Sequence, residues 1–593
     1  MIDLRAKPYY LDDEGVKWVE ATIASMTPEE KIGQLFVNMG ASRTEEYLTQ
    51  VLRDYKFGAV RYNPGKAAEV HEQNRILQEN SKIPLLIASN AESGGNGACT
   101  DGTYVGFPIK LGAANDPRWA YELGRISGVE SSAIGCNWAF APVVDLLLNW
   151  RNPIISNRAF GADPDLVLEY GKAYLKGMAE SGVACAMKHF PGDGVDERDH
   201  HLSSSANSMS MEEWDATFGK VYAGMIEAGV QSVMVGHIMM PAYQRHFSPN
   251  AKNSDLLPAS LCKELTTDLL KGKLGFNGLV VTDASHMVGM TSAMPRRLVL
   301  PTAIAAGCDL FLFFNDPEED LNWMMEGYRN GIITEERLTE ALRAILGTKA
   351  ALGVHKKDKK DIVEPAETAL KKIGLPENKA IAVQVTDHAI TLAKNVQAPN
   401  MAPILPVTPE RYPRILIIPV KGPLNPAAAI FGGGGTPPWE TFAEELRKRG
   451  HQVEIFESAI DKLIKLPEAE QAKGLRNMYA GKAPISGLTS KYDLIINVAQ
   501  VVGGMQPVER VSWPASKGTP DLPWYVHEIP TILISFSTPF LLADAPAVKC
   551  VVNAYDARTA TIEETAAKLA QGVEAFKGAS PVDVFCGFPD THI

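Results

Sequence analysis

The sequence predicts an α/β protein in which an N-terminal TIM (β/α)8 barrel is followed by a C-terminal α/β sandwich domain. Three observations support this prediction. Short apolar runs alternate with longer helical patterns from about residue 30 to 350, and a second alternating set follows beyond residue 376. At 593 residues, the chain is also longer than one hydrophobic core usually serves. We therefore expect a barrel of ordinary size and a smaller partner domain.

The barrel prediction rests on eight apolar runs that end in polar or chemically reactive side chains. They occupy residues 32–38, 59–62, 84–88, 138–142, 184–189, 232–237, 278–282 and 309–314. Between the runs, residues 119–134 and 166–181 repeat apolar side chains every three or four positions, as helices do, and Thr27-Pro28 is typical of a helix start. In such a barrel, the active site lies at the carboxyl ends of the strands.

The second domain is predicted from five further apolar runs separated by helical segments. These runs cover residues 414–420, 451–456, 492–498, 531–535 and 549–553. Before them, residues 354–376 are rich in lysine and interrupted by proline, which indicates a solvated linker. The expected division is therefore a barrel over residues 1–353, a linker over 354–376 and a sandwich over 377–593.

The composition favours a neutral small-molecule substrate. The chain is 45% hydrophobic and 22% charged, with a formal net charge of −12 and no long basic run. A nucleic-acid or anionic-membrane partner would require a basic surface, so neither is expected.

The cysteines and the N-terminal residues predict a cytoplasmic protein. The seven cysteines form no Cys-X-X-Cys pair and lie mostly in apolar segments, as expected for buried thiols in a reducing compartment. The first ten residues mix charged and apolar side chains and lack the apolar core of a signal peptide.

The first candidate for chemistry is the charged loop that follows the fifth predicted strand. Within residues 188–201, glycines and ionisable groups crowd the end of an apolar strand. Asp199 and His201 are spaced so that the carboxylate could orient the imidazole, leaving its other nitrogen free to transfer a proton. A hydrogen-bonded loop histidine without a catalytic role is the alternative.

The second candidate is Asp283, at the end of the seventh predicted strand. A carboxylate at this position can point into the mouth of a barrel, where it can attack an anomeric carbon and form a covalent glycosyl-enzyme. Asp283 could instead cap a following helix, which is a common use of aspartate after a strand.

Together these segments resemble glycoside hydrolase family 3, in particular its β-N-acetylglucosaminidase branch. The family's Lys-His-Phe-Pro-Gly-X-Gly run followed by Asp-X-His is matched by residues 188–194 and 199–201. Its Gly-Phe-X-Gly-Leu-Val-Val-X-Asp run is matched by residues 275–283. Further matches in the first domain are residues 84–88, 138–145 and 157–161, and looser matches in the second domain are residues 530–535 and 553–556.

The resemblance implies a role for each matching residue. Asp283 would be the nucleophile and His201 the general acid/base, oriented by Asp199. The side chains that would bind sugar hydroxyl groups are Lys188, His189 and Arg158. The implied reaction is exo-acting double displacement with net retention, which requires no metal and no organic cofactor.

The chain departs from the family pattern at two positions. The aspartate that usually follows the third strand is Asn90 here, so an uncharged amide would face the sugar, and Asn90 is either a substrate ligand or a turn residue. The histidine of the usual Pro-Gly-His-Gly turn is Asp193. A second carboxylate near the dyad would favour imidazolium at His201, whereas one that faces solvent would have little effect. His200 is a second candidate for the acid/base.

Several alternatives remain open at this point. A phosphorylase of the same family would use phosphate in place of water, and β-glucosidase-type specificity would change the sugar. A metallohydrolase could use the histidines near the strand ends, and a non-catalytic sugar-binding homologue would have lost the activity. The natural glycan, whether a chitooligosaccharide or a cell-wall recycling fragment, and the oligomeric state are left undetermined.

Overall fold

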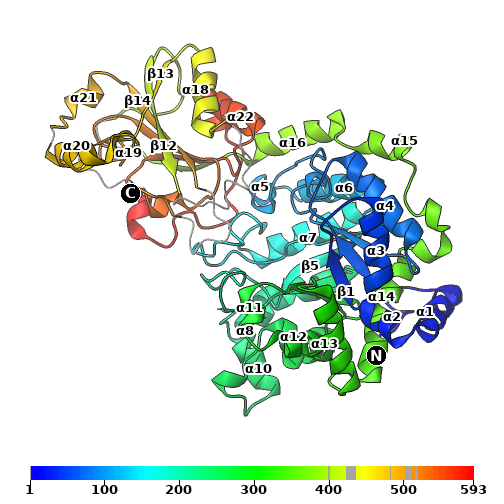
Figure 1. The fold of residues 1–593 in the computed structure, drawn as a ribbon. Helices are drawn as coiled ribbons and strands as arrows, with labels where there is room; N and C mark the ends of the chain where they lie inside the picture. Colours follow the sequence, from blue (N-terminus) through cyan, green and yellow to red (C-terminus); the bar gives the residue numbers. More distant parts are fainter. Residues whose placement is uncertain (1, 398–400, 423–435, 481, 502–509, 514–518) are drawn as a thin grey trace. The chain divides into compact units, whose positions relative to one another are not determined.

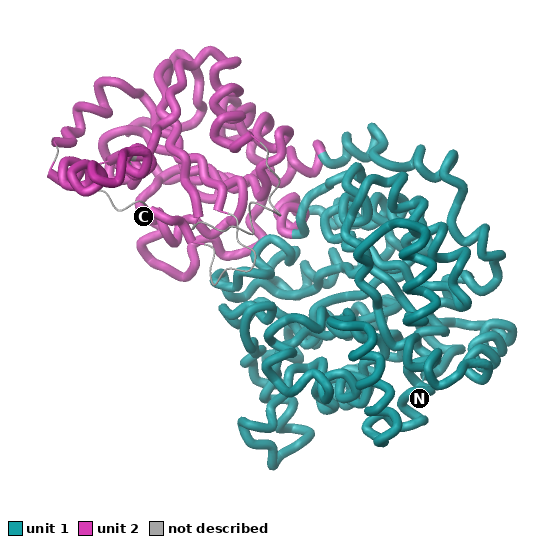
Figure 2. Tube along the Cα trace, viewed as in Figure 1, with its two compact units in different colours: residues 1–108, 116–382 teal, residues 109–115, 383–593 magenta. Residues whose placement is uncertain are grey.

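The computed structural model describes residues 2–397, 401–422, 436–480, 482–501, 510–513 and 519–593. The chain divides into two compact units, shown in different colours in Figure 2. The first contains Met1–Pro108 and Asp116–Ala382, and the second contains Ile109–Asn115 and Val383–Ile593. The residues expected to form the linker make short helical turns that group with the first unit. The domain limits expected from the sequence stay a prediction.

The first unit is a closed barrel of eight parallel strands, which confirms the predicted fold class (Figure 1). Its strands, in barrel order, are β1 (Phe36–Met39), β10 (Leu310–Leu312), β9 (Leu279–Ala284), β7 (Ser232–Val235), β5 (Ala184–Phe190), β4 (Trp138–Ala139), β3 (Leu86–Ser89) and β2 (Ala59–Arg61). The barrel closes at β1, where Val37 aligns with Leu312 on one side and Ala59 on the other. A small two-stranded sheet of β6 (Ser205–Ala206) and β8 (Ile238–Met239) lies outside the barrel sheet.

The first strand begins later than the apolar run predicts. Residues Pro28–Gly33 form helix α2, and the Thr27 hydroxyl and the Glu30 side chain complete a capping box at its start. The predicted helix start at Thr27 is therefore confirmed, whereas Ile32 belongs to this helix and not to β1. A short apolar run does not by itself distinguish a buried helix end from a strand.

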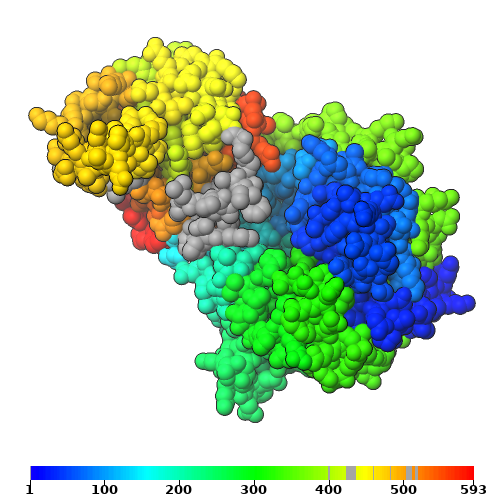
Figure 3. Space-filling model, viewed as in Figure 1, coloured from blue at the N-terminus to red at the C-terminus, as the bar shows by residue number. Residues whose placement is uncertain are grey.

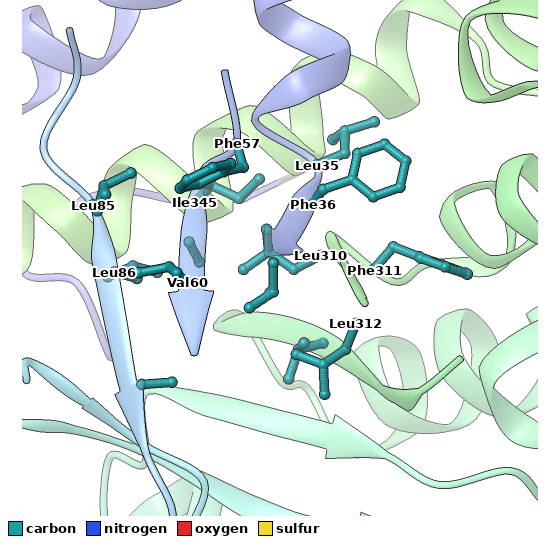
Figure 4. Packing of buried hydrophobic residues seen from close by; sticks show 14 of the residues in the cluster. Leu35, Phe36, Phe57, Val60, Leu85, Leu86, Leu310, Phe311, Leu312 and Ile345 are labelled. Atoms are coloured by element: carbon teal, nitrogen blue, oxygen red, sulfur yellow. The ribbon is translucent and has the colours of Figure 1, made fainter. Parts of the chain in front are cut away.

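Apolar side chains from neighbouring strands fill the barrel core. Figure 4 shows Phe36, Val60, Leu86 and Leu310, from β1, β2, β3 and β10, within one cluster. The polar atom of a buried tryptophan is also satisfied there, because Trp138 Nε1 donates to Ser232 Oγ at 2.8 Å. Because the interior is packed, chemistry has to take place at an end of the barrel.

Helices surround this barrel. They are α1 (Asp13–Ser25), α2, α3 (Glu45–Tyr55), α4 (Ala67–Asn80), α6 (Arg118–Ala133), α7 (Pro164–Ala179), α8 (Met211–Trp214), α9 (Lys220–Glu227), α10 (Pro241–Phe247), α11 (Val288–Thr291), α12 (Arg296–Ala306), α13 (Pro317–Arg329), α14 (Glu335–Ala351) and α15 (Ala366–Ala369). Helices α6 and α7 confirm the two predicted from periodicity. Helices α1 and α14 lie side by side, and Arg343 pairs with Glu20 at 2.8 Å between them (Figure 1). The space-filling view in Figure 3 shows the N-terminal residues, in dark blue, at the surface of the first unit.

The second unit contains a six-stranded sheet with helices, as predicted. The strand order is β11 (Thr391–Asn395), β16 (Cys550–Asn553), β15 (Thr531–Ser535), β14 (Leu494–Gln500), β12 (Arg414–Lys421) and β13 (Gln452–Ile455). Its helices include α18 (Pro438–Lys448), α19 (Ala459–Ile464), α20 (Glu468–Ala480), α21 (Ser486–Thr489) and α22 (Thr559–Gln571), while α16 (Pro376–Ala389) contains the division between the units. The antiparallel edge strand β11 was not predicted, because Thr-Leu-Ala-Lys-Asn has no continuous apolar run.

Other predictions from composition concern the cysteines and membrane segments. All seven cysteines are free and buried, in agreement with the sequence. Across the described residues, no helix has both the length and the apolar character needed to cross a membrane.

A buried lysine outside the barrel mouth leads to a prediction about stability. Lys349 is fully buried in α14, and its Nζ donates to Gln34 Oε1 at 2.9 Å. Burial lowers the pKa of Lys349 to about 7, whereas an unfolded lysine titrates near 10.4. Between these values the unfolded chain binds more protons, so this group makes the fold more stable as pH rises.

Lys349→Met should therefore remove a pH-dependent gain in unfolding free energy on the order of 3 kcal/mol between pH 7 and 10. Urea unfolding of both proteins at several pH values would measure the difference. Replacing the exposed Lys360 in the same way is the matched control and should leave the slope unchanged. Parallel curves for wild type and Lys349→Met would contradict the prediction.

Candidate active site

Ionisable side chains gather at the carboxyl ends of five adjacent barrel strands. They are Glu92 after β3, Asp145 after β4, Lys188 and His189 on β5, His237 after β7 and Asp283 on β9. Because these strands are parallel neighbours, their ends meet at one rim of the barrel. The loop that follows β5 adds Asp193, Asp199, His200 and His201.

Asp283 is a buried carboxylate with one free oxygen. Its Oδ1 accepts the backbone N–H of Ala284 at 2.7 Å, and its Oδ2 has no hydrogen-bond partner within the described residues. His189 Nε2 lies 3.9 Å from Oδ2. Burial opposes ionisation, but the surrounding histidines, His189 first, outweigh it and hold the pKa of Asp283 well below its ordinary value. Asp283 lies within β9, so the helix-cap alternative does not describe it.

Asp199 and His201 form the hydrogen-bonded dyad that their spacing suggests. His201 Nδ1 and Asp199 Oδ1 are 2.6 Å apart, and the same oxygen accepts the His201 backbone N–H at 2.8 Å. Asp199 is buried, whereas 21% of the His201 side chain is exposed. The carboxylate therefore fixes the ring, and Nε2 is left available for proton transfer.

Backbone hydrogen bonds join the dyad to the loop that carries Asp283. The carbonyl of His201 accepts the N–H of Val288 at 3.0 Å, and the carbonyl of His200 accepts the N–H of Gly289 at 2.9 Å. A side chain at Gly289 would lie 2.9 Å from two backbone carbonyl oxygens, so this approach requires glycine. The two loops are thus held together by the fold.

Two cations converge on Glu92. Lys188 Nζ lies 2.6 Å from Glu92 Oε1, and Arg158 forms a bidentate pair with both oxygens at 2.8 and 2.9 Å. Burial opposes the charge on Glu92, but the two cations outweigh it and hold the pKa of Glu92 well below its ordinary value. Lys188 and Arg158 are therefore fixed through Glu92, while Arg158 Nη2 also lies 3.4 Å from His189 Nε2.

His189 is oriented by a carboxylate in the same way as His201. Its Nδ1 lies 2.7 Å from Asp145 Oδ2, and its backbone N–H donates to Asp145 Oδ1 at 3.1 Å. Asp145 is completely buried. The other ring nitrogen of His189 is directed toward Asp283 and Arg158.

The structure also places the two positions that depart from the family pattern. Asn90 is half-buried just beyond β3, and within the described residues its side-chain amide makes no hydrogen bond. Asp193 is buried and faces His200, with Oδ2 at 3.6 Å from Nε2. Burial and the charge of Asp145 raise the pKa of Asp193 to about 8.

The sequence left two possibilities for Asp193: proximity to the His201 dyad or exposure to solvent. The structure shows a third arrangement, because Asp193 is buried and faces His200 instead of His201. His200 is fully buried, and burial holds its pKa well below the ordinary value. A ring that is neutral and closed off from solvent is a poor acid/base, so the geometry favours His201 over His200.

Three of these side chains are close enough to be considered as metal ligands. The ligand atoms of Asp199, His200 and His201 all lie within 4.8 Å of one another. However, Asp199 Oδ1 and His201 Nδ1 bond to each other, and His200 Nδ1 accepts the backbone N–H of His237 at 3.3 Å. A metal would have to replace these hydrogen bonds, and we assign none.

Sequence reasoning missed Glu92 and Asp145 as members of the site. Both follow predicted strands and both lie in segments that resemble the family, so the signal was a carboxylate just beyond a strand end. Their importance was hidden because their partners are distant in sequence: Glu92 contacts residues 66 and 96 positions later.

Chemically, the site combines a carboxylate with a free oxygen, a carboxylate-oriented imidazole and a fixed pair of cations. The first two are the components of covalent glycosyl transfer, and charged donors bind sugar hydroxyl groups well.

Several known proteins are similar to this chain. Residues 27–348 match the model described as the glycosyl hydrolase family 3 N-terminal domain. A Cellulomonas fimi protein named beta-N-acetylglucosaminidase/beta-glucosidase is 41% identical over 594 residues and covers 100% of both chains. A beta-hexosaminidase of Chromobacterium violaceum is 33% identical over 40% of this chain and 64% of its own. Among solved structures, beta-glucoside phosphorylase BglX bound to 2FGlc has a TM-score of 0.88 at 37% identity, with 99% of each chain covered.

Proposed function

Because the chain belongs to glycoside hydrolase family 3, we propose that it is a retaining, exo-acting β-N-acetylglucosaminidase that removes terminal β-linked N-acetylglucosamine. The observation that supports this most is the pairing of two groups across hydrogen-bonded loops: Asp283, with a free carboxylate oxygen, and the Asp199–His201 dyad. A nucleophile and a separate proton donor are what double displacement requires.

In the proposed reaction, His201 protonates the leaving-group oxygen while Asp283 attacks the anomeric carbon. The C–O bond to the leaving group breaks as the bond to Asp283 forms, giving a covalent glycosyl-enzyme. His201, now neutral, removes a proton from the incoming acceptor, which displaces Asp283 with net retention. Asp199 stabilises the imidazolium at each stage.

The sugar would be held by the fixed cations and their neighbours. Lys188 and Arg158 would donate to sugar hydroxyl groups, with His189 beside them. Asn90 would add an uncharged amide, which can both donate and accept. Because Asn90 is uncharged, the site could also accept a sugar other than N-acetylglucosamine, such as glucose. The Cellulomonas fimi relative is named for both β-N-acetylglucosaminidase and β-glucosidase.

A second candidate is phosphorolysis, in which inorganic phosphate replaces water. Two observations favour it: the proposed acid/base is a histidine, which can become neutral and then does not repel an anion, and the similar BglX structure is named a phosphorylase.

One assay tests both candidates. The protein is incubated with the p-nitrophenyl β-glycosides of N-acetylglucosamine and of glucose, in phosphate and in a phosphate-free buffer. We expect faster p-nitrophenol release from the N-acetylglucosaminide and free sugar as the product. Sugar 1-phosphate in phosphate buffer would establish phosphorolysis instead, and no release from either glycoside in either buffer would overturn the proposed function.

A further inference from the structure

His200 lies at the centre of a group of histidines at the barrel rim. Its ring centroid is 5.2 Å from that of His201, 5.8 Å from that of His189 and 6.1 Å from that of His237. It is completely buried, so substrate cannot reach its nitrogens in this arrangement. The proposed reaction gives it no role.

The contacts of His200 determine where its proton lies. Nδ1 faces the backbone N–H of His237 at 3.3 Å and must accept, so the proton of the neutral ring is on Nε2. Nε2 points toward Asp193 Oδ2, 3.6 Å away. Among the described residues, neither of these two buried atoms has a hydrogen-bond partner.

Asp193 is held so that only Oδ2 remains for His200. Its Oδ1 accepts from Asn152 Nδ2 at 2.8 Å and from the Gly194 N–H at 2.6 Å. Its backbone N–H donates at 2.8 Å to Asp145, the carboxylate that orients His189. Burial and Asp145 disfavour the ionised form of Asp193, and the Nε2–H of His200 is the donor that faces Oδ2 and can offset this cost.

We propose that Asp193 and His200 are positioning residues for the acid/base. Asp193 accepts a hydrogen bond from the Nε2–H of His200, and this buried pair holds His201 against the loop that follows Asp283. The inference rests on the proposed function of His201. The pair acts through the backbone, because His201 is the next residue and both carbonyls of the His200-His201 segment bind the loop carrying Val288 and Gly289. Hydrogen bonds of this kind are often long without substrate and shorten in the Michaelis complex.

Asp193→Asn tests the pair directly. The amide oxygen will stay with the two donors at Oδ1, so the new NH2 group faces the N–H of His200 and the contact is lost. A misplaced acid slows only those substrates whose leaving group must be protonated. We expect kcat/KM to fall by roughly 100-fold for a phenyl glycoside and by less than about 3-fold for the 2,4-dinitrophenyl glycoside.

Two further variants separate positioning from stability. His200→Gln keeps an acceptor for the His237 N–H and a donor for Asp193, so we expect it to retain most of the wild-type activity, whereas His200→Ala should behave like Asp193→Asn. The matched control is His71→Gln, at a buried histidine whose Nε2 lies 2.7 Å from the Glu364 carbonyl away from the site. It should leave the ratio between the two substrates unchanged.

The thermal midpoint of each variant shows whether it folds. If Asp193→Asn does not fold, the comparison of His200→Gln with His200→Ala tests the proposal in its place. Equal losses on both substrates, or unchanged activity in Asp193→Asn and His200→Ala, would overturn the positioning role and leave the proposed glycosidase intact. A wild-type protein that is inactive on both aryl glycosides would overturn both.

Discussion

Replacing Asp283 by alanine is expected to lower kcat/KM for aryl glycosides by at least about 10⁴-fold. Oδ1 of Asp283 accepts the backbone N–H of Ala284, whereas Oδ2 has no hydrogen-bond partner within the described residues, and the proposed reaction forms its covalent bond at Oδ2. Among the other carboxylates of the site, Glu92 is bound by two cations and Asp145 by His189, whereas Asp193 and Asp199, which also have an unpartnered Oδ2 within the described residues, are turned toward His200 and His201. We therefore expect that no neighbouring carboxylate replaces Asp283 as the nucleophile in this variant.

The variant should also be less stable. The histidines around Asp283 outweigh the cost of its burial and lower its pKa, so the ionised carboxylate stabilises the fold at neutral pH, and we expect a lower thermal midpoint for Asp283→Ala. Asp268→Ala, at a surface aspartate paired with Lys263, is the matched control and should keep full activity. Azide should restore turnover in Asp283→Ala by attack from the vacated face, giving an α-glycosyl azide.

Loss of activity with no azide product would leave the nucleophile unassigned among the carboxylates of the rim. Retained activity above one hundredth of the wild-type rate would contradict the role of Asp283. Trapping of a glycosyl-Asp283 adduct with a 2-fluoro sugar, followed by peptide mass spectrometry, would measure the covalent step directly.

Glu92→Gln is expected to affect stability and catalysis together. The substitution leaves Lys188 and Arg158 close to each other without the carboxylate that neutralises them, and breaking a buried pair in this way costs about 3 kcal/mol. The two cations should separate, and a displacement of about 1 Å at such a site typically costs about 100-fold in rate. We therefore expect a lower thermal midpoint, a higher KM and a lower kcat.

Glu130→Gln is the matched control for this prediction. Glu130 is also buried, in α6, and its hydrogen bonds go to Thr103, Gly374 and Asn378 and to none of the proposed sugar-binding side chains. It should destabilise the protein without changing KM. Equal effects of both variants on KM would show that Glu92 acts only through the fold.

Much of the fold could be predicted because its signal is local. All eight barrel strands are short apolar runs, and each is buried in the structure as such a run must be. Edge strand β11 was missed because its half-buried sequence Thr-Leu-Ala-Lys-Asn carries no such run, and its pairing with β16 depends on a partner more than 150 residues away.

The sequence by itself determined the barrel, the partner domain and the candidate pair of Asp283 with Asp199 and His201, because strand ends and closely spaced motifs are properties of neighbouring residues. Only the tertiary structure decided what Asp193 faces and what Glu92 holds. A buried carboxylate is defined by the charges and donors around it, and these come from other strands. For the same reason, the assignment of His200 changed from a rival acid/base to a buried neighbour of the dyad.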